Sequence, residues 1–180
     1  MPSGRRCCTH IIQCLSSGKI DSPDNMSNKI TKDKNVIMAE IGRLISEGKT
    51  VSITAKGYSM NPFIRHMQDS ITIGPWNDRD LKRGTAALVL TTAGEYVFHR
   101  IVKREGNMLV LEGDGNLCYK EKATIDNVVG IMHNITRNGR VYTPDSFCWK
   151  AYSWIWMTLR PVRRYPLGLW RRLVRQQPLK

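Results

Sequence analysis

Residues 85–116 read TAALVLTTAGEYVFHRIVKREGNMLVLEGDGN, a run of short apolar segments separated by turn residues. Three segments rich in β-branched and aromatic side chains predict strands, at Thr85–Thr91, Tyr96–Lys103 and Met108–Leu111. Glycine-containing breaks typical of hairpins separate them, at Ala93-Gly94 and Glu105-Gly106-Asn107. Because no helical periodicity interrupts the run, the sequence predicts consecutive antiparallel strands here.

The same strand pattern continues on both sides of this run. Further strands are expected at Val51–Ala55, Ser70–Ile73 and Val128–Thr136, the last followed by an Asn138-Gly139 turn. Six or seven strands without intervening helices predict a compact, mainly β domain. Ahead of them, apolar residues at i, i+4, i+7 and i+8 predict one helix over residues 34–47, ended by Gly48; they are Ile37, Ile41, Leu44 and Ile45.

Length and composition exclude several classes of protein. The chain has 180 residues and a mass of 20.6 kDa, too short for a doubly wound nucleotide-binding fold with a second substrate domain. With 41% hydrophobic and 24% charged residues, global disorder is excluded. The net charge of +13 predicts an anionic partner. Five cysteines, three of them at positions 7, 8 and 14, predict a reducing compartment, and their scatter predicts no metal site.

The composition divides the chain into three parts. Residues 1–32 have no periodicity and no small-x-small cleavage site, so we expect a disordered tail or a mis-started one, with Met26 as the alternative start. Residues 33–144 carry the helix and the β domain. Residues 145–180 form a basic, tryptophan-rich tail in which Pro161 and Pro166 predict two short helices.

Three short stretches contain groups able to perform chemistry. They are Gly57-Tyr58-Ser59-Met60-Asn61-Pro62, His99-Arg100-Ile101-Val102 and Gly113-Asp114-Gly115-Asn116. A serine hydroxyl attacks a carbonyl when a neutral histidine removes its proton, and a carboxylate can orient that histidine. His99 shares a strand face with Val97 and Ile101, and burial there favours its neutral form. Taken alone, the serine is more typical of a structural turn and the histidine of a core residue, and Gly113-Asp114-Gly115-Asn116 is compatible with a simple Asx turn.

Together, and in this order, the stretches resemble the catalytic domain of type I signal peptidases, whose fold is shared with LexA-like self-cleaving repressors. Gly57-x-Ser59-Met60-x-Pro62 is similar to the family's nucleophile box, and Gly113-Asp114-Gly115-Asn116 to its Gly-Asp-Asn box. Residues 81–85 resemble the segment that leads into the next strand, with Thr85 where an aspartate is usual. His99 stands where bacterial members carry lysine, which resembles the archaeal and endoplasmic-reticulum type. The resemblance covers residues 49–137.

The resemblance implies a signal-peptidase/LexA-like β domain and a serine endopeptidase that needs no cofactor. By it, Ser59 is the nucleophile, His99 the general base and Asp114 the group that orients the imidazole. Glu121 is the alternative to Asp114, and a third member can also be dispensable. Some members carry a serine at the position of Gly57 to stabilise the oxyanion, so here the amide of Ser59 takes that role. The remaining residues implied are Met60 and Pro62 in the nucleophile turn, and Arg100, Gly113 and Asn116 as supports. The expected substrate is a precursor peptide or protein cleaved after small residues.

The tail predicts a partner of its own. Residues 145–180 hold eight basic residues against one acid, together with four of the five tryptophans. Because no apolar stretch approaches the roughly 18 residues of a spanning helix, we expect a peripheral anchor on an anionic membrane and a cytoplasmic location on the inner membrane face. Its expected anchor residues are Trp149, Trp154, Trp156, Arg163, Arg164, Trp170, Arg171 and Arg172. A tail that merely covers the β domain is the alternative, and nucleic acid is a less favoured partner.

Two other functions are compatible with the same fold. A self-cleaving repressor needs a DNA-binding helical domain and a small-residue–Gly cleavage site ahead of the peptidase domain. Only one helix is predicted before Ser59, and no Ala-Gly or Cys-Gly pair precedes it, which disfavours this function. The other function is a non-catalytic module that binds a membrane or nucleic acid, and the intact Ser59 and His99 disfavour it.

Overall fold

The computed structural model describes residues 36–116 and 119–175, and the fold is mainly β. The predicted tail at residues 1–32 lies outside the described residues. The strands are β1 (Val51–Thr54), β2 (Asp69–Gly74), β3 (Ala86–Leu90), β4 (Tyr96–Glu105), β5 (Met108–Glu112), β6 (Glu121–Thr124), β7 (Val128–Arg137) and β8 (Arg140–Tyr142). Two short 3₁₀ turns, η1 (Asp78–Asp80) and η2 (Ile125–Asn127), connect strands.

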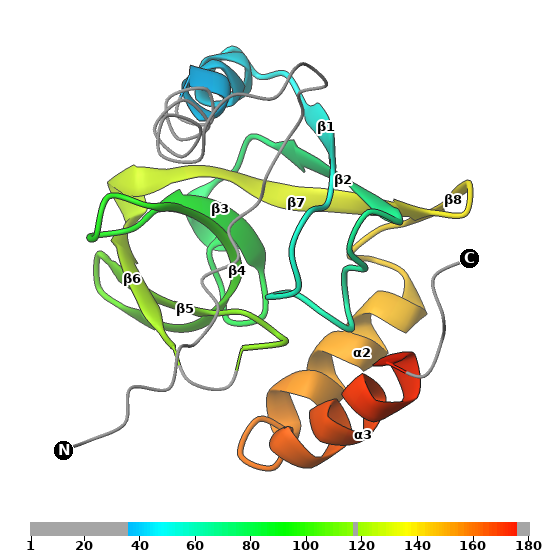
Figure 1. Ribbon diagram of the computed structural model, residues 1–180. Helices are drawn as coiled ribbons and strands as arrows, with labels where there is room; N and C mark the ends of the chain where they lie inside the picture. Colours follow the sequence, from blue (N-terminus) through cyan, green and yellow to red (C-terminus); the bar gives the residue numbers. More distant parts are fainter. Residues whose placement is uncertain (1–35, 117–118, 176–180) are drawn as a thin grey trace, which may run out of the picture.

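All strand pairs are antiparallel, in the order β1-β2-β7-β3-β4-β5-β6, with β8 added to β7. Figure 1 shows the strands from β3 to β6 curling round, so that the sheet forms a half-barrel. The six predicted strands are confirmed. The sequence missed β6 and β8, because β6 buries only Ala123 fully and β8 is three residues long, so neither carries an alternating pattern.

The β7–β8 connection illustrates how local chemistry determines the register of the sheet. Asn138 and Gly139 have φ values of 49° and 74°, the left-handed conformation that a two-residue hairpin turn requires. This turn pairs Arg137 with Arg140 and Ile135 with Tyr142. The predicted Asn-Gly turn is therefore confirmed.

The N-terminal helix is described from residue 36 to residue 46. It ends in a Schellman motif, in which Gly48 N donates to Ile45 O at 2.9 Å and Lys49 N donates to Leu44 O at 3.0 Å. Gly48 has a φ of 80°, which explains why glycine stands there. The helix buries Ile41 and Ile45 against the sheet, as its periodicity predicts.

The sheet separates two apolar clusters, and β4 contributes to both. Phe98 joins the cluster beneath the N-terminal helix, which also holds Ile71, Ile73 and Met132. The neighbouring β4 residues Val97 and Ile101 face the other way, into a cluster inside the curl of the sheet. His99 lies on this second face, as its alternation predicts.

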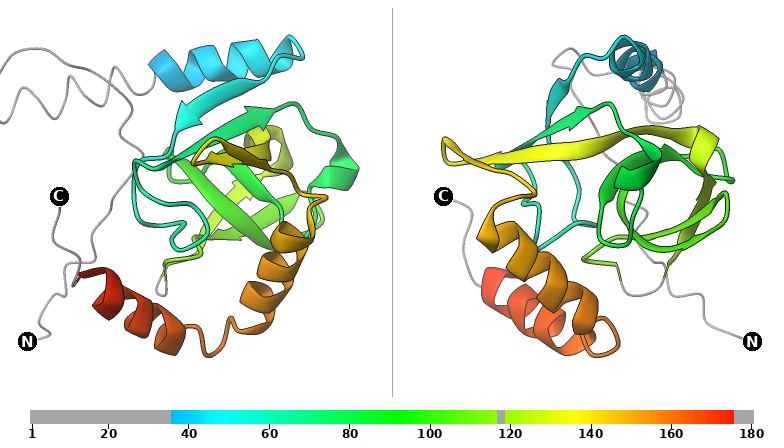
Figure 2. Two further views of the ribbon diagram at one scale, coloured as in Figure 1. Left: turned by 90° about the vertical axis from the view of Figure 1, so that its right-hand side faces the viewer. Right: turned by 180° about the vertical axis from the view of Figure 1, so that it is seen from behind.

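The C-terminal segment forms α2 (Phe147–Thr158) and α3 (Arg164–Arg175), so the two predicted helices are confirmed. Pro161 lies between them, whereas Pro166 lies in the first turn of α3, where its missing N–H leaves no hydrogen bond unmade. Figure 2 shows the two helices on the side of the sheet away from the N-terminal helix. Among the described residues, no helix has both the length and the apolar character needed to cross a membrane.

Candidate functional site

The turn that carries Ser59 connects β1 to β2, and hydrogen bonds join its two ends. Ala55 N donates to Asp69 O at 2.9 Å, and Met67 N donates to Ala55 O at 2.7 Å. The backbone amides of Ser59 and Met60 donate no hydrogen bond to any residue in the described part of the chain. Two neighbouring free N–H groups beside a half-buried serine hydroxyl can stabilise a developing oxyanion.

His99 projects from β4 and is only 6% exposed. Its Nδ1 atom lies 3.0 Å from Oε2 of Glu121, the first residue of β6. The sheet brings these residues together because β5 lies between β4 and β6: Ile101 pairs with Leu111, and Leu111 pairs with Glu121. A carboxylate beside Nδ1 accepts a hydrogen bond from the N–H group of that nitrogen and leaves Nε2 free to act as a base.

The backbone carbonyl of Ser59 and the imidazole of His99 both lie against Gly113, which follows β5. A Cβ atom at Gly113 would clash with the carbonyl oxygen of Ser59 and would lie 3.1 Å from Nε2 of His99. Gly115 N donates to Ser59 O at 2.7 Å and so holds the nucleophile turn against this loop. No hydrogen bond between the Ser59 hydroxyl and His99 occurs in the described residues, and such contacts often tighten only when substrate binds.

Asp114 does not orient His99, so this prediction is wrong. Its carboxylate is 1% exposed and accepts two hydrogen bonds from Arg100, Nε to Oδ1 at 2.9 Å and the terminal nitrogen to Oδ2 at 2.8 Å. Arg100 follows His99 directly in β4, so the two side chains point to opposite faces of the strand. The carboxylate that pairs with Arg100 therefore lies on the other side of the strand from His99. Glu121, the predicted alternative, is the group that contacts the imidazole.

The buried Arg100–Asp114 pair changes the ionisation of its neighbours. Burial opposes the charge on Arg100, but attraction to Asp114 and the hydrogen bonds outweigh it, so the pKa of Arg100 is raised. Tyr152 from α2 directs its hydroxyl to Asp114 at 3.5 Å. Burial, followed by the charge of Asp114, raises the pKa of Tyr152, which keeps the phenol neutral.

His66 supports the nucleophile turn. The imidazole is half-buried, and its Nδ1 accepts a hydrogen bond from Gly57 N at 2.8 Å. Its ring also packs against that of Tyr58 at a tilt of 33°, with ring centroids 4.6 Å apart. No pattern in the sequence signals this contact, because it depends on the path of the turn between the two residues.

The C-terminal helices hold the loop that contains Gly113 and Asn116. Trp156 Nε1 donates to Asp114 O at 3.2 Å. Arg160 donates to Glu112 at 2.5 Å, and Arg163 bonds both Glu112 and the carbonyl oxygen of Asn116. Burial and repulsion from Arg100 lower the pKa of Arg163, despite its pairing with Glu112. Glu112 and Arg160 were not predicted as site residues, because their pairing joins segments far apart in the chain.

Three of the predicted membrane-anchor residues are buried, so their assignment is wrong. Trp149 and Trp156 pack in the protein, and Arg163 is ion-paired with Glu112. An aromatic stack explains the burial: Phe63 from the nucleophile turn stacks on Tyr152, which stacks on Trp156. The anchor residues that lie exposed are Trp154, Arg164 and Arg172. The side chains of Trp170 and Arg171 lie outside the described residues.

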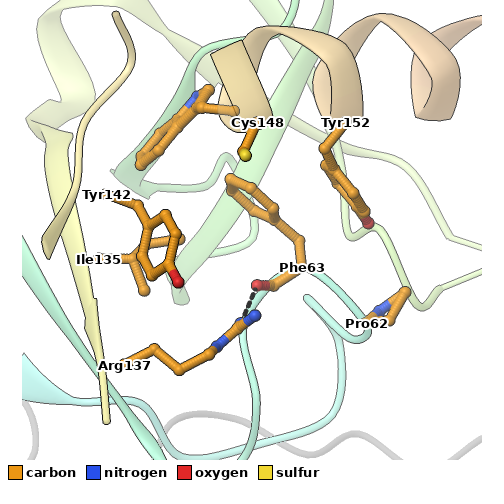
Figure 3. A pocket seen from close by; sticks show the side chains of 8 residues that line it. Pro62, Phe63, Ile135, Arg137, Tyr142, Cys148 and Tyr152 are labelled. Carbon is orange, nitrogen blue, oxygen red and sulfur yellow. Dashed lines mark hydrogen bonds between the residues drawn. The ribbon is translucent and has the colours of Figure 1, made fainter. Parts of the chain in front are cut away.

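Two cavities adjoin the nucleophile turn. The smaller has a volume of about 20 Å³ and is apolar, with Ser59 in its wall; the other lining residues are Ile53, Ala55, Lys56, Gly57, Met60, Ile64, Ile71 and Phe98. The larger, of about 240 Å³, lies between α2, β7 and the residues after Ser59. Figure 3 shows it lined by aromatic rings, with Arg137 donating to Phe63 O at 2.7 Å.

The arrangement therefore contains a serine in a tight turn, a buried histidine with a carboxylate on its far nitrogen, and free backbone amides. Of the two other predicted residues of the nucleophile turn, Met60 is buried and Pro62 lines the larger cavity. Comparison with protein-family models, curated proteins and solved structures found no match to this chain.

Proposed function

We propose that the chain is a serine endopeptidase of signal-peptidase type, built on a signal-peptidase/LexA-like half-barrel. The observation that carries the proposal is the meeting of the Ser59 turn with Nε2 of His99 at Gly113, while Glu121 occupies the other imidazole nitrogen. Residues 59, 99, 113 and 121 come from two strands and two loops, and each alone has an ordinary structural explanation. Their joint position supports nucleophilic catalysis.

In the proposed reaction, Nε2 of His99 removes the proton from the Ser59 hydroxyl as Oγ bonds to the carbonyl carbon of the scissile peptide. The carbonyl oxygen becomes an oxyanion, which the amides of Ser59 and Met60 stabilise. The C–N bond then breaks, and the leaving amine takes the proton from His99. Water attacks the resulting ester in the same way and restores the free serine. Glu121 holds the imidazole and stabilises its charged form.

The small cavity beside Ser59 supports a preference for small substrate residues. Its volume of about 20 Å³ has room for about one methyl group. The strand β1 leads into the turn at the edge of the sheet, with Ile53 in the cavity wall. A peptide added alongside β1 in extended conformation would therefore bring an alanine-sized side chain to the cavity. The proposed substrate is a precursor peptide or protein with a small residue at the cleavage site.

The experiment is labelling by a serine-directed phosphonate, combined with cleavage of a peptide library that has small residues at the scissile bond. Ser59→Ala and His99→Ala are each expected to abolish labelling and to lower kcat/KM by several orders of magnitude. Ser46→Ala is the matched control, because Ser46 is exposed on the N-terminal helix and its hydroxyl donates to Arg43 O of the same helix, at 2.7 Å. Activity retained in Ser59→Ala would refute the proposal.

A further inference from the structure

Large apolar side chains gather on the outward face of the C-terminal helices. Of the 11 strongly exposed large hydrophobic residues in the described part of the chain, six lie between residues 147 and 169. They are Phe147, Trp154, Ile155, Val162, Tyr165 and Leu169. Phe147 is 84% and Trp154 is 70% exposed. We call these six residues the outer apolar face; a concentration of this kind marks a site of interaction.

The geometry of α2 explains why this face points away from the protein. Trp149, Tyr152 and Trp156 recur at i, i+3 and i+7 and pack towards the half-barrel. Phe147 and Trp154 are seven positions apart and lie on the opposite side of the helix. The inner face of α2 is therefore buried against the half-barrel, whereas the outer apolar face lies exposed at the surface. Figure 2 shows α2 and α3 at the surface of the molecule, with the sheet on one side of them only.

The charge around this face is strongly positive. Eight basic residues and no acidic residue follow Asp145. Arg160 and Arg163 share one carboxylate, that of Glu112, which offsets one of their two charges, whereas Arg164 and Arg172 are exposed. On α3, Arg172 lies seven positions after Tyr165 and so shares its side of the helix. The same surface thus combines apolar groups with guanidinium groups.

We infer that the outward face of α2 and α3 docks on an anionic membrane surface. Aromatic and aliphatic side chains enter the boundary between headgroups and acyl chains, and the arginines meet anionic headgroups. The bases of a nucleic acid could stack on Phe147 and Trp154, but they would interact only weakly with the aliphatic side chain of Ile155. A second copy of the chain would bring the same arginines face to face. Of these three partners, an anionic bilayer makes the fullest use of the surface, because it contacts the aliphatic groups as well as the aromatic and basic ones.

The docking would place the candidate active site beside the bilayer. The inner side of α2 contacts the site directly, through the bond from Trp156 to Asp114 and the stacking of Tyr152 on Phe63. In the docked protein, α2 therefore lies between the membrane and the loop that contains Gly113. Docking is independent of the proposed peptidase activity and can be tested without it.

The test is sedimentation of the full chain with vesicles of phosphatidylcholine, with and without phosphatidylglycerol. Strong binding is expected only when phosphatidylglycerol is present, and it should weaken at high salt. Trp154→Ser is expected to lower the partition coefficient about tenfold or more, because a large ring leaves the bilayer. Arg172→Gln should lower it about fivefold, the loss expected for one headgroup contact.

Matched controls are Val36→Ser and Arg79→Gln, two exposed residues away from α2 and α3. Both should bind like the wild type. The inference is overturned by equal binding to both kinds of vesicle, by equal losses in test and control variants, or by no binding at all. Displacement from vesicles by nucleic acid would overturn it in favour of that partner. Concentration-dependent dimers that Trp154→Ser abolishes, seen in analytical ultracentrifugation without vesicles, would overturn it in favour of self-association.

Discussion

The Nδ1 atom of His99 lies 3.0 Å from Oε2 of Glu121, a residue 22 positions later in the chain. Both side chains are largely buried, so the contact is shielded from solvent. The strand order β4-β5-β6 creates it, because β5 carries the register from one residue to the other. This contact, rather than one with Asp114, completes the candidate site.

Glu121→Gln is expected to lower kcat/KM by about 10²-fold, because the amide can still contact Nδ1 but no longer stabilises the imidazolium. Steady-state kinetics on a peptide that the wild type cleaves would measure the effect. Glu95→Gln, at the exposed end of a hairpin, serves as the control. If Glu121→Gln retained full activity, Glu121 would have no role in orienting the base.

Gly113→Ala is expected to lower activity by about 10²-fold or more. The added methyl group would collide with the carbonyl oxygen of Ser59 and press on Nε2 of His99, and small displacements of reacting groups are costly. Gly168→Ala is the matched control, since a Cβ atom there meets nothing within 4 Å. Peptide cleavage and the melting temperature should be measured for both. A Gly113→Ala variant with normal activity would show that Ser59 and His99 do not react together at this position.

Asp114→Asn should affect folding stability more than the chemistry of the site. Replacing one member of a buried ion pair leaves Arg100 without its counter-charge, at a cost of about 3 kcal/mol or more in the free energy of unfolding. Urea denaturation would give this value. Asp78→Asn, which breaks the exposed pair with Arg104, should leave stability within experimental error. Equal stability of the two variants would contradict a buried Arg100–Asp114 pair.

His66→Leu is expected to lower kcat/KM about tenfold, because the amide of Gly57 loses its acceptor and the nucleophile turn loosens. His66→Asn should recover much of the activity, since its side-chain oxygen can occupy the place of Nδ1. Comparison of kcat, KM and melting temperature separates a positioning role from a purely structural one. Equal activity of the two variants, with a change only in melting temperature, would exclude the positioning role.

The raised pKa of Tyr152 predicts how the stability of the fold depends on pH. Its raised pKa keeps the phenol neutral in the folded protein, whereas an unfolded tyrosine ionises near pH 10.0. The folded state then binds more protons, so stability is present below this pH and falls as the pH rises above it, by at most about 1.4 kcal/mol per pH unit. Tyr152→Phe should flatten this alkaline decline, measured by urea unfolding between about pH 8 and about pH 11. An unchanged slope would contradict the burial of the phenol.

Most of the fold could be predicted from the sequence, because its signals are local. The alternation of β4 places His99 with Val97 and Ile101 on one face, and the Asn138-Gly139 pair specifies a hairpin. The short strand β6 escaped prediction because its residues Glu121 and Lys122 give no apolar alternation. Glu121 was therefore predicted only as an alternative partner of His99, and not from its place in a strand.

By itself, the sequence determined which groups with reactive chemistry are present and which strand faces they occupy, since steric alternation and turn preferences act over a few residues. Only the tertiary structure decided which of them meet. It assigned Asp114 to Arg100, Glu121 to His99, and Trp149 and Trp156 to the interior. The physical reason is that Asp114 and Glu121 carry the same carboxylate group, so only the register of the sheet decides which of them contacts His99. In the same way, only the packing of α2 on the half-barrel decides which tryptophans are buried and which are exposed.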